Sequence, residues 1–92
     1  MEMAPNPEDF AKVVRRARRA RDWTQAELAH RSGVSLGTVI AIEHARSSYW
    51  GTLAVLAQAL GIKFSELVKE AEVLADHHLV ADAAPTPPQI LP

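Results

Sequence analysis

Residues 23–44, WTQAELAHRSGVSLGTVIAIEH, constrain the fold more than any other stretch, because they hold two helix starts with one helix stop between them. Thr24 and Glu27 form a T-x-x-E capping box, which is typical of the first turn of a helix. Gly33 is placed to end that helix in the left-handed conformation. Ser35 can start a second helix only two residues later. Two short helices with so tight a connection must cross at a steep angle, which is the helix-turn-helix unit.

Three more helices are predicted around this pair. Asn6, followed by a proline and two carboxylates, predicts a first helix that runs to about Arg21. Thr52 is expected to cap a fourth helix that Gly61 ends, and Ser65 lies near the start of a fifth. Apolar residues recur at helical spacing in each segment, and no alternating pattern is long enough to predict a strand. The predicted fold is therefore all-α, a compact domain of five helices.

The chain is expected to divide into three parts. Residues 1–7 form a flexible N-terminus, 8–75 the helix-turn-helix domain, and 76–92 a helix extension and flexible tail, with the two-helix unit itself at 24–44. From about Asp82, the sequence DAAPTPPQILP has four prolines and no periodicity. We therefore expect a disordered Pro-rich C-terminal tail.

Charge and composition exclude several classes of protein. The 92 residues contain no cysteine, which excludes a disulfide scaffold and any thiolate metal site. No apolar run approaches the roughly 18 residues of a membrane span, and the acidic N-terminus is unlike a signal peptide, so we expect a cytoplasmic protein, nucleoid-associated when bound to DNA. The net charge is −1, but residues 1–50 carry +2 and residues 51–92 carry −3. Five arginines within 15–21 make a basic patch that fits nucleic acid, and also fits a solvated helix face.

Catalytic chemistry has little support in this sequence. The four histidines are scattered, and neither a cysteine nor a paired carboxylate completes a metal site with them. The four glycines form no phosphate-binding loop, and no Ser/His/Asp order can be defended. We therefore expect no enzyme activity, no catalytic residues, no cofactor and no metal.

The segment TQAELAHRSGVSLGTVIAIE, with LAVLAQALGI downstream, resembles the lambda-repressor-like (Cro/repressor, XRE-type) helix-turn-helix DNA-binding family. The resemblance covers about Phe10 to Leu67. It rests on T-Q-x-E-L-A, a G-V-S turn, Glu43 eight residues past Ser35, and A-L-G-I, all in order at the family's spacing. It implies five helices packed as one small domain, with the third helix, here residues 35–44, in the major groove of double-stranded DNA.

The resemblance also implies roles for individual residues. Arg18 matches an arginine that pairs with a glutamate of the recognition helix, here Glu43. The residues agree with this role, since Arg18 borders the apolar stripe of its helix and Glu43 lies on the same side as Val39. Gln25 matches a residue that braces a phosphate. The other implied DNA contacts are Ser35, Leu36, Gly37, Thr38, Ala41, His44, Arg46, Ser47 and Ser48.

Two features depart from the family pattern. Ala45 lies where the family usually has a glycine in a left-handed turn, so we expect this loop to bend differently. The base-facing positions also lack the Gln, Arg or Asn that would bind a base edge with two hydrogen bonds. Apolar contact from Leu36 or Ile40 to a thymine methyl remains, with close backbone approach at Gly37 and Ala41. We expect modest base discrimination with phosphate contacts dominating, and the alternative is that Leu36 and Ile40 contact a protein.

Two classes of function fit these residues. The first is a transcriptional regulator, in particular a repressor, that binds operator DNA as a homodimer. The second is the antitoxin of a toxin–antitoxin pair, which binds a toxin or other small protein partner and represses its own operon. The Pro-rich acidic C-terminal stretch suits the second class without establishing it. For the homodimer we expect an interface on the fifth helix at Val73, Leu74 and Leu79, and the alternative is that this stripe folds back on its own domain.

Overall fold

The computed structural model describes residues 5–83, and the side chains of residues 5–76. Five helices and no strand make up these residues: α1 (Pro7–Ala20), α2 (Gln25–Ser32), α3 (Leu36–Glu43), α4 (Trp50–Leu60) and α5 (Phe64–Ala83). The predicted all-α fold of five helices is confirmed. The Pro-rich tail after Ala83 and the first four residues of the expected N-terminal segment lie outside the described residues.

Helix ends follow the local signals at several positions. Asn6 caps α1, where its Oδ1 accepts from the Asp9 N–H and the Asp9 Oδ2 accepts from the Asn6 N–H, each at 3.0 Å. Gly33 and Gly61 end α2 and α4 with φ of 77° and 76°, a backbone conformation that favours glycine. After Gly61 the N–H of Ile62 turns back to the α4 backbone. These ends confirm the predictions made from Asn6, Gly33 and Gly61.

The start of α4 differs from the prediction. Thr52 does not cap this helix, because the helix already begins at Trp50, and Tyr49 is its N-cap without a side-chain hydrogen bond. The indole of Trp50 lies edge-on to Phe10 and to Phe64, with ring centroids 6.3 Å and 5.1 Å apart. Packing against α1 and α5 therefore extends the helix two residues before the local capping signal. At the other end of the domain α5 continues to Ala83.

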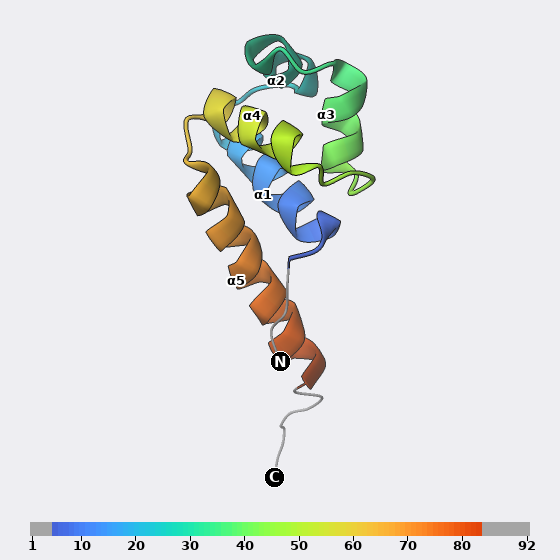
Figure 1. Ribbon diagram of the computed structural model, residues 1–92, viewed down its shortest axis with the longest axis vertical. Coiled ribbons are helices and arrows are strands. Elements are labelled where there is room, and N and C mark those ends of the chain that lie inside the picture. Colours follow the sequence, from blue (N-terminus) through green and yellow to red (C-terminus); the bar gives the residue numbers. More distant parts are fainter. Residues whose placement is uncertain (1–4, 84–92) are drawn as a thin grey trace.

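The core lies between α1 and the other helices. α1 packs on α3, α4 and α5, and α2 packs on α3 and α4. The buried side chains come from all five helices, and the large apolar ones with almost no exposure are Val13, Val14, Leu28, Val39, Ile42, Leu53, Leu56, Leu60 and Leu67. Figure 1 shows α2 and α3 together at one end, while α5 leads away from them. Val39 and Ile42 are buried, so one side of α3 packs on the core of the domain and its other side faces outward.

Among residues 5–83, no single helix is long and apolar enough to cross a membrane. α4 and the part of α5 up to Asp76 satisfy these criteria only as a pair, and they meet at an angle of 108°. Their buried leucines, at positions 53, 56, 60 and 67, belong to the core described above.

Candidate nucleic-acid interface

The connection between α2 and α3 is short, and backbone hydrogen bonds and core packing hold it. The Gly33 N–H donates to the Ala29 carbonyl over 2.9 Å and closes α2. Val34 is half-buried and packs on the core. The Ser35 Oγ then accepts from the Thr38 N–H over 3.2 Å and starts α3. With a left-handed glycine, a packed valine and a serine cap in sequence, the angle between α2 and α3 is well defined.

The start of α2 carries half of the expected capping box. The Thr24 Oγ1 accepts from the Glu27 N–H over 3.0 Å, as predicted. The Glu27 carboxylate does not complete the box, because it accepts from the Arg31 Nε at 2.6 Å, one helical turn later. The Arg31 guanidinium also lies 4.3 Å above the centre of the Trp23 ring. Arg31 thus contacts both the Glu27 carboxylate and the Trp23 ring, and its ion pair with Glu27 replaces the second hydrogen bond of the capping box.

Glu43, at the end of α3, is the centre of a buried polar network. Its side chain has no solvent exposure, and Arg18 has 8%. The Arg18 Nε donates to Glu43 Oε2 over 2.6 Å and Nη2 donates to Oε1 over 3.0 Å, while Nη1 donates to the Trp23 carbonyl. The structure thus brings together the two residues that the resemblance pairs. Since a buried charge without its partner is costly, this network holds α3 against α1.

Gln25 and Arg15 join this network from either side. The Gln25 Nε2 donates to Glu43 Oε1 over 3.1 Å, which leaves the second N–H of this amide for another acceptor. The Arg15 Nη1 donates to the backbone carbonyl of Glu43 over 2.6 Å. Neither contact was predicted. The sequence signal for Arg15 is weak, because it is one of five arginines within seven positions and nothing local distinguishes it.

The outward side of α3 carries apolar and small residues. Leu36 is 44% exposed, and Gly37 beside it is also exposed. Thr38, Ile40 and Ala41 are half-buried. The Ser35 Oγ donates to the Thr38 Oγ1 over 2.8 Å, so the two hydroxyl groups of this helix end bind each other. No charged side chain stands between Leu36 and Ala41.

The loop between α3 and α4 does not bend as expected. Ala45 adopts φ of 60°, so it keeps the left-handed turn for which glycine is usual. The turn is closed by the Ala45 N–H on the Ile42 carbonyl at 3.1 Å and by the Arg46 N–H on the Ala41 carbonyl at 2.8 Å. The prediction of a different bend is wrong, because these two hydrogen bonds outweigh the strain of a Cβ at positive φ. Past this turn Arg46 is exposed, and the two serines that follow are half-buried.

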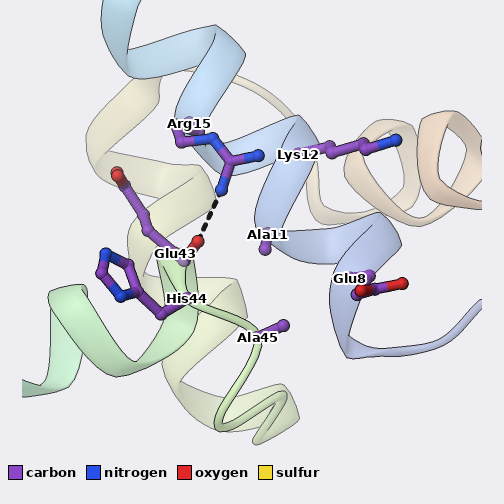
Figure 2. Close-up of a pocket in the computed structure, with 7 residues that line it drawn as sticks. All are labelled: Glu8, Ala11, Lys12, Arg15, Glu43, His44 and Ala45. Atoms are coloured by element: carbon purple, nitrogen blue, oxygen red, sulfur yellow. Dashed lines mark hydrogen bonds between the residues drawn. The ribbon is translucent and has the colours of Figure 1, made fainter.

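A shallow cleft of about 400 Å³ lies between α1 and the end of α3 (Figure 2). Its lining consists of Glu8, Ala11, Lys12, Arg15, Glu43, His44 and Ala45. Figure 2 shows Lys12 and Glu8 extending from α1 to the right of the view, while His44 points to the left, away from both. Arg15 is occupied by the Glu43 carbonyl. The charged groups therefore do not converge on one point, and within the described part of the chain no three His, Asp or Glu side chains are grouped to hold a metal ion.

The residues expected at a dimer interface have different surroundings. Val73 is 60% exposed on α5. Leu74 is half-buried and packs against the core of its own domain. The side chain of Leu79 lies outside the described residues. Of the two that can be placed, Val73 is thus the one that a second molecule could cover.

α2 and α3 are two short helices joined by a tight turn, and α3 has one side buried on the core and the other side exposed. This arrangement defines a helix-turn-helix domain. Residues 9–71 match the model of a family described as a helix-turn-helix domain, and the chain belongs to this family. The match agrees with the lambda-repressor-like resemblance and spans more than half of the chain. No curated protein and no solved structure matches the chain. Family membership supports DNA binding by a regulator as the class of function.

Proposed function

We propose that this protein is a transcriptional regulator, acting as a repressor, that inserts α3 into the major groove of operator DNA. The observation that carries the proposal is the contrast between the two sides of α3. Its inner side ends in the buried Arg18–Glu43 pair, which fixes the angle of the helix. Its outer side offers Gly37 and Ala41, whose small size lets a helix backbone come close to base edges. A helix that is held rigidly and has small residues on its outer side is well suited to enter the major groove.

Phosphate contacts supply most of the affinity in this proposal. Gln25 is the first residue of α2, where the helix N-terminus favours an anion, and one of its amide N–H groups is available. On the far side of α3, Arg46 is exposed and can reach a second phosphate, with His44 and the half-buried Ser47 and Ser48 next to it. Donors on both flanks of α3 would hold the helix in register on the duplex.

The active form in this proposal is a homodimer. One recognition helix covers only a few base pairs, and repressors of this type place two such helices about 34 Å apart, one turn of DNA. The contact between copies must then lie away from α3, and Figure 1 shows α5 leading away from that end. Val73, exposed on α5, is the described residue that we place at this interface.

Salt titration tests the proposal. The affinity of the full chain for a fluorescent 24-bp duplex would be measured by anisotropy between about 50 and 200 mM salt, with promoter DNA from its own operon and with a scrambled sequence. We expect log affinity to fall linearly with log salt, and scrambled DNA to bind within a few tens of fold of the promoter. If the chain binds neither the promoter duplex nor the scrambled duplex, DNA binding is refuted. Discrimination of about a thousandfold would refute the dominance of phosphate contacts.

A second function, as an antitoxin, is favoured by one observation. Tyr49 and Trp50, at the start of α4, are 72% and 56% exposed. Large aromatic side chains that are exposed together usually mark a surface that contacts another protein. A toxin or other small protein could cover them. Co-purification of the chain from its native host tests this function: a small protein that remains bound to the wild type and is lost with Tyr49→Ala supports it.

A further inference from the structure

We infer that α3 reads the C5-methyl groups of pyrimidines in the major groove, with Leu36 and Ile40 as the contacting side chains. These methyl groups are carried by thymine and by 5-methylcytosine. The inference rests on the proposed entry of α3 into the groove and specifies what the helix recognises there.

The side-chain hydrogen-bonding groups of α3 are few, and most of them are already engaged. Residues 35–43 contain no Arg, Lys, Asn or Gln, the side chains that bind base edges with two hydrogen bonds. The Ser35 Oγ accepts from the Thr38 N–H and donates to the Thr38 Oγ1. The carboxylate of Glu43 is buried on Arg18. The Thr38 O–H can still donate one hydrogen bond, but a single hydroxyl cannot bind a base edge with two hydrogen bonds, so this face is poorly suited to such readout.

The apolar side chains of α3 are arranged to meet a surface. Leu36 and Ile40 are four residues apart and therefore lie on one side of the helix, one turn after the other. Gly37 and Ala41 form a second row beside them at the same spacing. A Cβ at Gly37 would meet nothing within 4 Å, so this position stands free of other parts of the protein, while Ala41 is half-buried. The side chains of Leu36 and Ile40 are longer than those of Gly37 and Ala41 beside them. Leu36 and Ile40 would therefore be the first to reach the base edges.

The major groove offers one apolar group to such side chains. Thymine carries a methyl at C5, cytosine carries hydrogen there unless it is methylated, and the purines present only polar atoms and ring edges. Burial of one methyl-sized group contributes about 0.8 kcal/mol, which is roughly a fourfold gain in affinity. Contacts from both Leu36 and Ile40 would give about fifteenfold for one recognition helix. This range is compatible with the modest discrimination expected of the whole interface.

Two pairs of 24-bp duplexes test the inference, since the members of each pair differ only at C5. The first pair alternates dA with dT or with dU, and the second alternates dG with dC or with 5-methyl-dC. Binding of the full chain would be measured by anisotropy at one salt concentration. For one engaged recognition helix, we expect the dT duplex to bind roughly four- to fifteenfold more tightly than the dU duplex, and two helices of a dimer on the same duplex would square this gain. A similar gain in the second pair shows that 5-methylcytosine is read as well, and a gain confined to the first pair assigns the readout to thymine.

Variants separate a direct contact from an effect of the methyl group on DNA shape. Leu36→Ala should reduce the difference between dT and dU about fourfold. Val55→Ala is the control, because Val55 is also exposed but lies on α4. Equal affinity within both pairs, or a dT–dU difference that Leu36→Ala leaves unchanged, overturns the inference while DNA binding stands. Absence of salt-dependent binding to all four duplexes overturns the proposed function and the inference together.

Discussion

The guanidinium of Arg18 and the carboxylate of Glu43 form a two-bond ion pair that joins α1 to the end of α3. The Nε–Oε2 distance is 2.6 Å and the Nη2–Oε1 distance is 3.0 Å. Both side chains are almost completely removed from solvent. Either charge left alone there would lose most of its hydration without compensation. The orientation of α3 therefore depends on a pair that is 25 residues apart in the sequence.

Replacement of Arg18 by alanine should be strongly destabilising. It leaves Glu43 buried with only Gln25 on its carboxylate, at a cost of about 3 kcal/mol, which lowers the Tm of a domain of this size by more than about 10 °C. Arg16→Ala is the matched control, since Arg16 is exposed on the same helix and should change stability by less than about 0.5 kcal/mol. Thermal unfolding by circular dichroism compares the two. Equal melting temperatures would mean that the pair contributes nothing to the fold.

The features predicted correctly from sequence are those that a few adjacent residues determine. Asn6 with Asp9 caps a helix, and Gly33 and Gly61 end helices, whatever surrounds them. The start of α4 was mispredicted because Trp50 is held by Phe10, 40 positions earlier in the sequence, and local capping rules do not include such contacts.

For the candidate site, the residues of α3 and the loop could be named only through the resemblance to a family. Their orientation was not predictable from single positions. That Gln25 touches Glu43, or that Arg15 among its neighbouring arginines reaches the end of α3, follows from how α1, α2 and α3 pack. The turn at Ala45 shows the converse, because a residue with a poor local preference is held at positive φ by hydrogen bonds from both sides.

Replacement of Ala45 by glycine should stabilise the protein. At φ of 60° the alanine Cβ costs about 1 kcal/mol, and the greater freedom of glycine in the unfolded chain removes only part of this gain. We expect a rise of up to about 1 kcal/mol in the free energy of unfolding, measured in urea. Ala26→Gly, on the exposed side of α2, is the control and should lower it by a similar amount. A loss of stability with Ala45→Gly would show that the turn carries no strain.

Replacement of Gly37 by alanine should change stability and DNA binding in opposite directions. The added Cβ meets nothing within 4 Å, and alanine is favoured over glycine inside a helix by about 0.5–1 kcal/mol, so the free energy of unfolding should rise. On DNA the same methyl group would stand between the α3 backbone and the base edges. Affinity should therefore fall, as measured by anisotropy on the duplexes described above. Unchanged affinity would place the Gly37 side of α3 away from the groove.

Replacement of Val73 by glutamate should separate the proposed dimer without unfolding the domain. Val73 is 60% exposed, so a charge is tolerated in the monomer but not in a contact between two copies of α5. Sedimentation should show a folded monomer with weakened DNA binding. Leu74→Glu is the contrast, because Leu74 packs on its own core and this change should lower the Tm. A wild-type chain that is already monomeric at high micromolar concentration would contradict the interface.

Replacement of Arg46 by alanine should reduce the salt dependence of DNA binding by about one unit in the slope of log affinity against log salt. The reason is that each phosphate neutralised by the protein releases about one condensed counterion from the duplex. The backbone of the loop should be unaffected, because the Arg46 N–H, and not its side chain, binds the Ala41 carbonyl. Lys69→Ala is the control, since this exposed cation lies on α5 and should leave the slope unchanged. If both variants keep the wild-type slope, Arg46 does not touch a phosphate; if both lower it equally, the effect comes from net charge alone.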